Sequence, residues 1–457
     1  MVVANYGNTI PFWDQWDVEI DRFYRPWLEG NLDWFSLIAP HNEHRVFTGR
    51  VLALLLFVLG GNVINPMLQI AVNAVLHTVV LLLLLQALLR ALPDSSSRLP
   101  VTLVVALIFA VPLGVENILF NNSALYFLIL FGILFIHALS RSGNQSILGW
   151  FAPVFATALL GCLSFASGAI TLAAGVALLA VQWLTGVRRN HATIIMIVML
   201  SVMMLVSVHF TPSIPAHASY KSRSLVDFAL SMLSMTGGLV FYVPSAVFIY
   251  RQIRRKPEAG DASWFLFTLL LWVAGQMLIL AYGRGHRNVM ASRYLDLYTI
   301  GFVANFLALF VNMKDPALQW SLKPLRIWLV LFFTLIGVAF PKVSKELQNS
   351  RAEVRECESR VSAYLRTQDQ SVLDEPEAKI PYPDPVRLKQ LLDQKIVQSM
   401  LPPFLAGDDG QSGSKAKSKF PKALFIAGSI LAGIGTGLFC SRLFDASVVF
   451  GIGKVSG

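Results

Sequence analysis

Apolar runs long enough to cross a membrane dominate the pattern of apolar and polar positions along the chain. A spanning helix needs about 20 mostly apolar residues, and runs of about 16 or 17 serve when interfacial aromatic residues flank them. By this measure the sequence predicts about eleven spans. They cover residues 66–90, 100–115, 123–140, 148–164, 167–187, 193–209, 225–249, 264–283, 295–313, 325–341 and 421–440.

The apolar run VLALLLFVLG at residues 51–60 has a different pattern. Arg50 precedes it, and GGNVINP ends it after about ten apolar residues, which is too short for a crossing. We therefore expect a helix that lies in the membrane interface.

A polar stretch at residues 342–420 separates the last two predicted spans. It contains IPYPDPVRLKQLL and SMLPPFL and ends in the low-complexity linker GDDGQSGSKAKSK. Too few apolar residues lie here for a catalytic domain, so we expect a small extracytoplasmic helical segment, with residues around 343–366 helical.

These patterns predict an all-α fold, a polytopic transmembrane helical bundle with one interfacial helix. The predicted regions are an extracytoplasmic first loop (1–65), a transmembrane helical core (66–341), the extracytoplasmic polar segment and linker (342–420), and a final transmembrane helix with its tail (421–457).

Composition agrees with a membrane protein. The 457 residues are 55% hydrophobic and only 14% charged, with mean hydropathy +0.59, outside the usual range of soluble domains. The net charge of +10 comes from short Lys and Arg clusters between apolar runs, which orient membrane proteins, so we expect no nucleic-acid partner. Cys162, Cys357 and Cys440 are far apart and predict neither a disulfide framework nor a metal site.

The basic clusters also predict which loops share a side, because cytoplasmic loops collect Lys and Arg. If residues 51–60 do not cross, one side holds Arg90, Arg98, Arg141, Arg188, Arg189, the cluster RQIRRK at 251–256, Lys314, Lys323 and Arg326. We expect that side to be the cytoplasm. The other side receives residues 1–65, the links ENILFNNS and SFASG, the loops 210–224 and 284–294, and the stretch 342–420.

The first 45 residues contain no run apolar enough for a signal peptide or a first span. This arrangement predicts either that residues 66–90 act as a reverse anchor, or that a first span precedes Met1. We favour a start assigned too late.

The ionisable residues expected outside the cytoplasm fall into three places. The first is the amino-terminal arm, with Asp14, Asp17, Glu19 and Asp21 and then His41, Glu43, His44 and Arg45 of PHNEHR. The second is Glu116 with Asn117, where a carboxylate follows a span. The third is YGRGHRNVMASRY, with Arg284, Arg287, Arg293 and Tyr294.

Acids and arginines on one membrane surface suit a reaction on a lipid-linked phosphate. Guanidinium groups hold phosphate oxygens, and a carboxylate takes a proton from an attacking hydroxyl. Plainer interpretations remain open: the acids form a solvated face, and the arginines and tryptophans are interfacial anchors. The set His41, Glu43 and His44 can bind a divalent cation, or it caps the interfacial helix and pairs internally. No P-loop, dinucleotide fingerprint, HExxH or GxSxG motif stands out.

The arm carries a resemblance to known proteins. PFWDQWDVE, followed by PHNEHR and NPMLQIAVNAVLH, resembles the first extracytoplasmic loop of GT-C type glycosyltransferases. The set FWDQWD, PHNEHR, GVEN, SRYLDL and IPYPDP is similar to a bacterial family of largely uncharacterised membrane proteins often grouped with them, over most of residues 5–405. The chain departs from the pattern in lacking the first span.

The resemblance implies an enzyme of the bacterial inner (plasma) membrane that moves a sugar from a polyprenyl-phosphate carrier to a glycan, lipid or protein on the extracytoplasmic side. It implies Asp17 as the base or acceptor-orienting acid, with Asp14 or Glu19 as alternatives, and Arg293 as the ligand of the lipid phosphate. The rival hypotheses are a lipid-linked glycan transporter or flippase and a non-catalytic membrane scaffold. Few charges lie within the apolar runs and no internal repeat is evident, so we rank transport second.

Overall fold

The computed structural model describes residues 2–92, 94–120, 123–140, 147–236, 239–315, 318, 323–376 and 379–405. The chain forms two units, residues 1–402 and 403–457. In the second unit only the short 3-10 helix η6 (Pro403–Leu405) is described, and the predicted span 421–440 lies outside the described residues. All other described helices belong to the first unit.

The described part of the first unit is helical, with one isolated bridge between His41 and His44 and no named strand. Six of its helices are long and apolar enough to cross a membrane. They are α4 (Pro66–Leu89), α7 (Ser123–Ser140), α10 (His191–His209), α13 (Ser263–Asn288), α14 (Ser292–Met313) and α15 (Lys323–Thr367). For the described residues this confirms the predicted all-α fold class, with six helices that could span a membrane, while the count of about eleven spans stays a prediction.

Five further apolar helices are shorter. They are α3 (Phe47–Leu59), α5 (Arg98–Ala110), α8 (Ile147–Ser164), α9 (Gly168–Leu184) and α11 (Leu225–Thr236). With 13 residues, α3 is about 20 Å long, less than the roughly 30 Å of a hydrocarbon core. That length fits the interfacial helix expected at residues 51–60.

Two predicted spans have the wrong limits. The run 225–249 is not one helix: α11 ends at Thr236, and the 3-10 turn η4 (Leu239–Tyr242) leads into α12 (Val243–Arg255). Two consecutive glycines follow Thr236 in the sequence, and Pro244 is favoured in the first turn of a helix, so the sequence favours a new helix start at α12. The span 325–341 continues through Pro341 as the single 45-residue helix α15, which includes the helix expected around 343–366.

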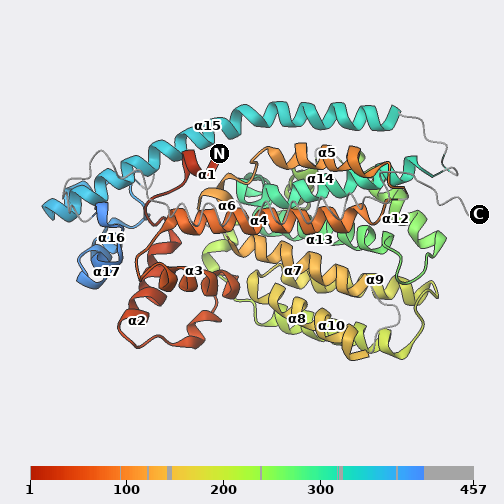
Figure 1. Cartoon of the computed structure of the whole chain (residues 1–457), viewed down its shortest axis with the longest axis horizontal. Coiled ribbons are helices and arrows are strands. Elements are labelled where there is room, and N and C mark those ends of the chain that lie inside the picture. The colour runs from red at the N-terminus through yellow and green to blue at the C-terminus, as the bar shows by residue number, and fades with distance from the viewer. Residues whose placement is uncertain are drawn as a thin grey trace, which may run out of the picture. The chain divides into compact units, whose positions relative to one another are not determined.

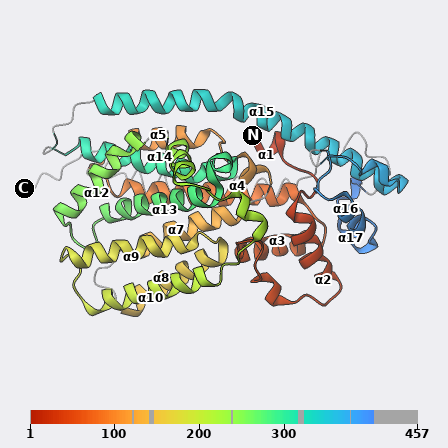
Figure 2. The same ribbon diagram turned by 180° about the vertical axis from the view of Figure 1, so that it is seen from behind.

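Helix α13 is the centre of the bundle and packs against α7, α9, α11 and α14. Trp264 and Trp272 on this helix are almost fully buried, and the Trp272 indole donates a hydrogen bond of 2.9 Å to Thr171 on α9. Figures 1 and 2 show α4, α7, α9 and α13 running roughly side by side, with α15 along the outside. The outer face of α15 stays apolar and exposed, as at Val330 and Val338, which suits contact with lipid.

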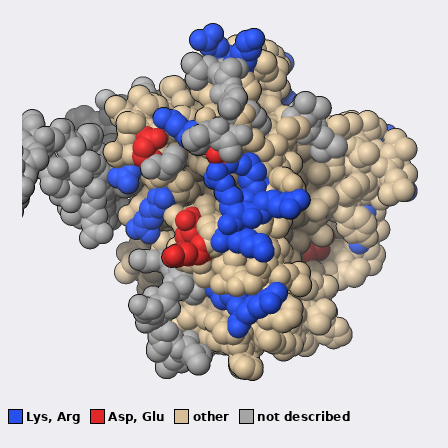
Figure 3. Space-filling model, turned by 90° about the vertical axis from the view of Figure 1, so that its right-hand side faces the viewer, with Lys and Arg blue, Asp and Glu red and all other residues tan. Residues whose placement is uncertain are grey.

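The loops gather at two ends of this bundle. One end carries the basic connections, including Arg90 after α4, Arg251 and Arg255 on α12, and Lys314 after α14. Figure 3 shows Lys and Arg concentrated on that face. The arm and the short helices α6 (Val115–Leu119), α16 (Pro385–Leu392) and α17 (Lys395–Met400) lie at the other end (Figure 1). Segments expected on opposite sides of a membrane are thus separated in space.

Candidate functional site

The arm folds into several short helices at the end away from the basic loops. They are α1 (Val2–Tyr6), the π-helix η1 (Gln15–Tyr24), α2 (Arg25–Leu28) and the 3-10 turn η2 (Trp34–Leu37). Trp16 is fully buried, and its indole donates to the Pro11 carbonyl at 3.0 Å. Trp16 is therefore part of a packed core, whereas the exposed Trp13 still fits an interfacial anchor.

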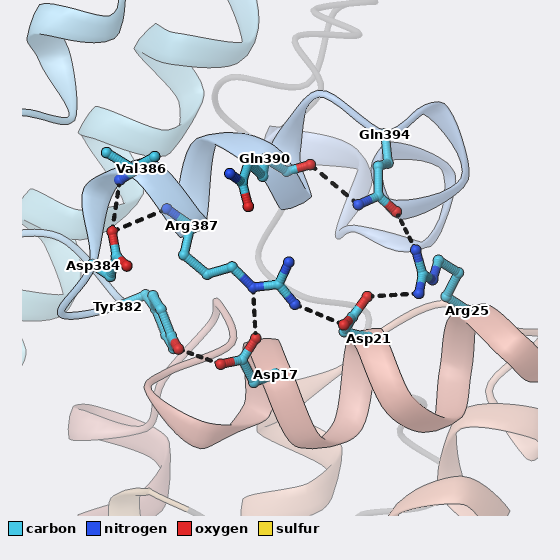
Figure 4. A network of polar contacts seen from close by, with 9 residues as sticks. All are labelled: Asp17, Asp21, Arg25, Tyr382, Asp384, Val386, Arg387, Gln390 and Gln394. Carbon is cyan, nitrogen blue, oxygen red and sulfur yellow. Dashed lines mark hydrogen bonds and ion pairs between the residues drawn. The ribbon is translucent and has the colours of Figure 1, made fainter.

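Asp17, the acid favoured by the sequence, is held by the polar segment after α15. The Tyr382 hydroxyl donates to one carboxylate oxygen, and Arg387 Nε donates to the other at 3.0 Å (Figure 4). Arg387 also donates to Asp21 at 2.7 Å, and Arg25 completes the row with an ion pair to Asp21 at 3.0 Å. We call Asp17, Asp21, Tyr382 and Arg387 the arm clasp.

The arm clasp is built on the start of α16. Asp384 accepts from the backbone N–H groups of Val386 and Arg387 at 3.0 and 3.1 Å, which caps the helix and directs Arg387 toward the arm. Burial, together with the hydrogen bond to Asp17, raises the pKa of Tyr382, so its hydroxyl remains a donor. Both oxygens of Asp17 are thereby engaged in holding two segments together.

Glu19 faces the opposite way, into the protein. It accepts from Gln69 on α4 at 2.9 Å and from the Tyr24 hydroxyl at 2.8 Å. Burial raises the pKa of Glu19, although these hydrogen bonds partly offset that rise. The structure therefore places Glu19 in a network that anchors η1 on α4.

Asp14 is the acid of the arm that remains open to solvent. Its side chain is 70% exposed, and one oxygen lies 3.0 Å from His41 Nε2. This hydrogen bond, with smaller contributions from the charges of His41 and Arg293, lowers the pKa of Asp14. Asp14 is therefore an ionised carboxylate at neutral pH, oriented by an imidazole.

Glu116, Asn117 and Arg293 meet across α6 and the start of α14. Arg293 Nε lies 3.4 Å from Glu116, and Ser292 donates to the same carboxylate at 2.9 Å. The Asn117 side chain donates to the Arg293 carbonyl at 2.9 Å. The Arg293 side chain is 52% exposed and lies over the ring of the buried Tyr294. Its guanidinium is thus positioned but still reachable.

These contacts bring the arm beside the start of α14. Phe12, two residues before Asp14, stacks on Phe120 just after α6, with ring centroids 4.8 Å apart. We call Asp14, His41, Glu116 and Arg293 the acid–arginine face. It combines an oriented carboxylate with an accessible guanidinium, a pair able to accept a proton and to hold a phosphate oxygen.

The PHNEHR residues connect the arm to other loops. Glu43 accepts from His217 at 2.6 Å, and Arg45 donates to the Phe210 carbonyl at 3.0 Å. His44 stacks on Phe165 at 3.8 Å, and its Nδ1 accepts from a backbone N–H at 3.3 Å.

Burial lowers the pKa of His44 to about 4, which keeps the imidazole neutral and able to accept. His41, Glu43 and His44 each turn to a different partner. Among the described residues, no group of three or more His, Cys, Asp or Glu is arranged to hold a metal.

Arg284 and Arg287 lie on either side of a kink in α13. Gly285 between them has φ +57° and ψ 174°, a conformation open only to glycine. Asp227 accepts from the backbone N–H of His286 at 3.1 Å, which satisfies a donor freed by the kink. Within the part of the chain that the structure describes, neither arginine forms a hydrogen bond or an ion pair, so both guanidiniums are available to an anion.

Sequence reasoning passed over three residues that the structure makes prominent. Tyr382 and Arg387 stand in the quoted motif IPYPDPVRLK but carried no role. Asp296 of SRYLDL is buried, and it accepts from Asn117 at 2.8 Å. A carboxylate in an otherwise apolar helix is itself a signal, because such a group needs a partner in the membrane.

Comparison with known protein families, with curated proteins and with solved structures finds no match to this chain. The geometry of the site is therefore the basis for any functional proposal.

Proposed function

We propose that the protein is a membrane glycosyltransferase that moves a sugar from a polyprenyl-phosphate carrier to a glycan, lipid or protein acceptor. The observation that carries the proposal is the acid–arginine face: exposed Asp14 is oriented by His41, half-exposed Arg293 is held by Glu116, and the Phe12–Phe120 stack joins the two segments. The face sits at one end of an apolar helical bundle, where a lipid phosphate would lie.

The roles divide between the two sides of this face. Asp14 takes or orients the proton of the acceptor hydroxyl as that oxygen attacks the sugar carbon. Arg293 holds the phosphate oxygens and stabilises the charge that builds as the carrier phosphate departs, with Arg284 and Arg287 as further cations. His41 and Glu116 position Asp14 and Arg293, respectively.

The structure shifts our assignment of the acid from Asp17 to Asp14. Both Asp17 oxygens accept hydrogen bonds from the segment after α15, and the side chain is only 31% exposed, whereas Asp14 is 70% exposed and more accessible to an acceptor hydroxyl. Asp17 and Glu19 fit positioning of the arm better than chemistry.

The proposal includes a membrane arrangement of GT-C type. Four of the five shorter apolar helices would cross together with the six long ones, and α3 would lie in the interface. The predicted span 421–440, outside the described residues, would bring the total to about eleven crossings. The basic end would face the cytoplasm of a bacterial inner membrane, and the acid–arginine face would lie outside it. Supporting this arrangement, the arm stacks on Phe120 just after α6, and the start of α14 pairs with Glu116 on α6, at the end opposite the basic loops.

The test is transfer by full-length protein reconstituted in liposomes with labelled polyprenyl-phosphate sugar. Removing a general base costs about 10²–10⁴-fold in rate, so Asp14→Asn should nearly abolish transfer. Arg293→Ala should lower it about 10²-fold or more, as expected for a group that stabilises transition-state charge. Asp17→Asn, which also removes one carboxylate of the arm, is the matched control and should keep most of the rate.

Two outcomes would contradict the proposal. Transfer that survives both Asp14→Asn and Arg293→Ala removes the assigned roles. Translocation of the lipid-linked sugar across the liposome without its transfer would identify a flippase instead.

A further inference from the structure

A cavity opens on the basic end of the bundle, at the opposite end from the acid–arginine face. Its volume is about 330 Å³, within the range of sites that hold a small ligand. The end of α4, the helix α12, the start of α13 and the end of α14 form its walls. It lies within the face on which Lys and Arg concentrate (Figure 3).

Three arginines line this cavity: Arg90, Arg251 and Arg255. Arg251 and Arg255 both contact the same oxygen of Asp315, whose side chain is only 3% exposed. One buried carboxylate is thus shared by two guanidiniums. The Arg255 side chain remains 56% exposed, so part of its guanidinium faces the opening.

The charges around the cavity do not cancel. Asp261 also lines it, but this acid is turned to the start of α13, where it accepts from the Ser263 backbone N–H at 2.8 Å. Three arginines against two carboxylates leave one net positive charge. Arg90, which directly follows α4, lies 3.5 Å from His137, which supplies no negative charge to offset it.

The rest of the lining is mixed: Gln252, Ser263 and Asn312 are polar, and the larger apolar side chains are those of three other residues. Leu92, Phe248 and Val311 contribute to the same walls as the arginines. A cavity lined by both guanidinium groups and apolar side chains suits an amphipathic anion better than a free one. Basic pockets between helices at a membrane surface are the kind of site that holds anionic lipid headgroups.

We propose that this cavity binds the phosphodiester headgroup of an anionic phospholipid. A phosphodiester carries a single negative charge, which matches the net charge of the site. Arg90, which follows α4, and Arg255 on α12 bind the phosphate oxygens, while Arg251 is held by Asp315. The acyl chains leave past the apolar lining residues toward the bilayer. The site is independent of sugar transfer, because it lies at the other end of the bundle.

The test measures binding of fluorescent phosphatidylglycerol to purified full-length protein in neutral detergent, with phosphatidylcholine and glycerol phosphate as competitors. Arg90→Gln combined with Arg255→Gln should weaken phosphatidylglycerol binding about tenfold or more, the loss expected from removing charge-assisted hydrogen bonds. Arg251 stays in place, so Asp315 keeps a partner.

The control is Arg254→Gln combined with Lys256→Gln. It removes the same charge from the same end of α12, but neither residue lines the cavity. Exposed charges are screened, so the control should change binding by about twofold or less. Melting temperatures of both double variants, measured without added lipid, establish that each is folded.

Equal losses in the two double variants would show that only diffuse surface charge is at work and would overturn the site. Competition by phosphatidylcholine as strong as by phosphatidylglycerol would refute recognition of an anion. Competition by glycerol phosphate at the same concentration as the lipid would show a site for free phosphate esters, which contradicts the lipid assignment.

Discussion

Replacing Arg387 by Gln should release the polar segment after α15 from the arm. Arg387 donates to Asp17 at 3.0 Å and to Asp21 at 2.7 Å, and the three side chains are only 18–31% exposed. The substitution removes both charged hydrogen bonds. It also leaves two carboxylates four residues apart on η1, of which Asp21 keeps its ion pair with Arg25.

The magnitude follows from these contacts. A hydrogen bond between charged groups contributes about 1.5–3 kcal/mol when it is well shielded from water, and an exposed ion pair only about 0–1 kcal/mol. The arm clasp lies between these limits. Arg25 still pairs with Asp21 in the variant, so we expect the loss of the two Arg387 contacts to destabilise the closed clasp by about 2 kcal/mol. That change in free energy raises the population of the open clasp about 30-fold.

Hydrogen exchange measures that opening directly. Amides of η1 and α16 should exchange about 30-fold faster in Arg387→Gln, while amides in α13 should not change. Lys389→Gln is the control: it removes one positive charge two residues away, from an ion pair with Asp393 at the end of α16, and an ion pair open to solvent contributes little to stability. Equal exchange in the two variants would refute the view that Arg387 ties the segment to the arm.

Three further predictions concern positions where the structure leaves little freedom. Burial holds the pKa of His44 near 4, so below about pH 6.5 the unfolded chain binds a proton at this residue and the folded protein does not. The melting temperature should therefore fall as the pH drops from 6.5 toward 4, and His44→Gln should reduce that fall. Gly285→Ala should destabilise the protein by about 1–3 kcal/mol, because its backbone conformation excludes residues with a side chain. Gly283→Ala, with nothing within 4 Å of the new Cβ, should leave the melting temperature unchanged or raise it slightly, because alanine favours a helix more than glycine does. Gly114→Ala should lower the free energy of unfolding by about 1–3 kcal/mol, because the new Cβ would collide with the Asp296 carboxylate. If the Gly285 or the Gly114 variant melted at the same temperature as the Gly283 variant, the claim for that glycine would be wrong.

The sequence predicted the helices well where an apolar run had clear ends. Helices α4, α7 and α10 begin and end within two residues of the predicted spans. Asn65 and Asn190 cap α4 and α10 by accepting backbone hydrogen bonds, a start signal visible in sequence.

Prediction failed where hydropathy and backbone geometry disagree. Hydropathy averaged over residues 225–249 conceals the glycine pair and Pro244, which end one helix and start another. The polarity change near residue 341 marked the end of an apolar run but not of a helix, since Pro341 is tolerated within α15.

The site was predictable in its location but not in its internal pairing. Counting loops and charges placed the arm, Glu116 and Arg293 together, because each helix long enough to cross reverses the side. No periodicity could have shown that Asp17 faces α16, since Arg387 lies 370 positions away in sequence.

The acids of FWDQWDVEID serve three different purposes because of where η1 places them. Asp17 and Asp21 are four residues apart and share a face of the helix, so both meet Arg387. Glu19, between them, points inward to Gln69. Asp14 precedes the helix and stays outside the packing that engages the others, beside His41. A short acidic motif is therefore not one site, and the contrast between Asp14→Asn and Asp17→Asn separates the proposed chemistry from the scaffold that supports it.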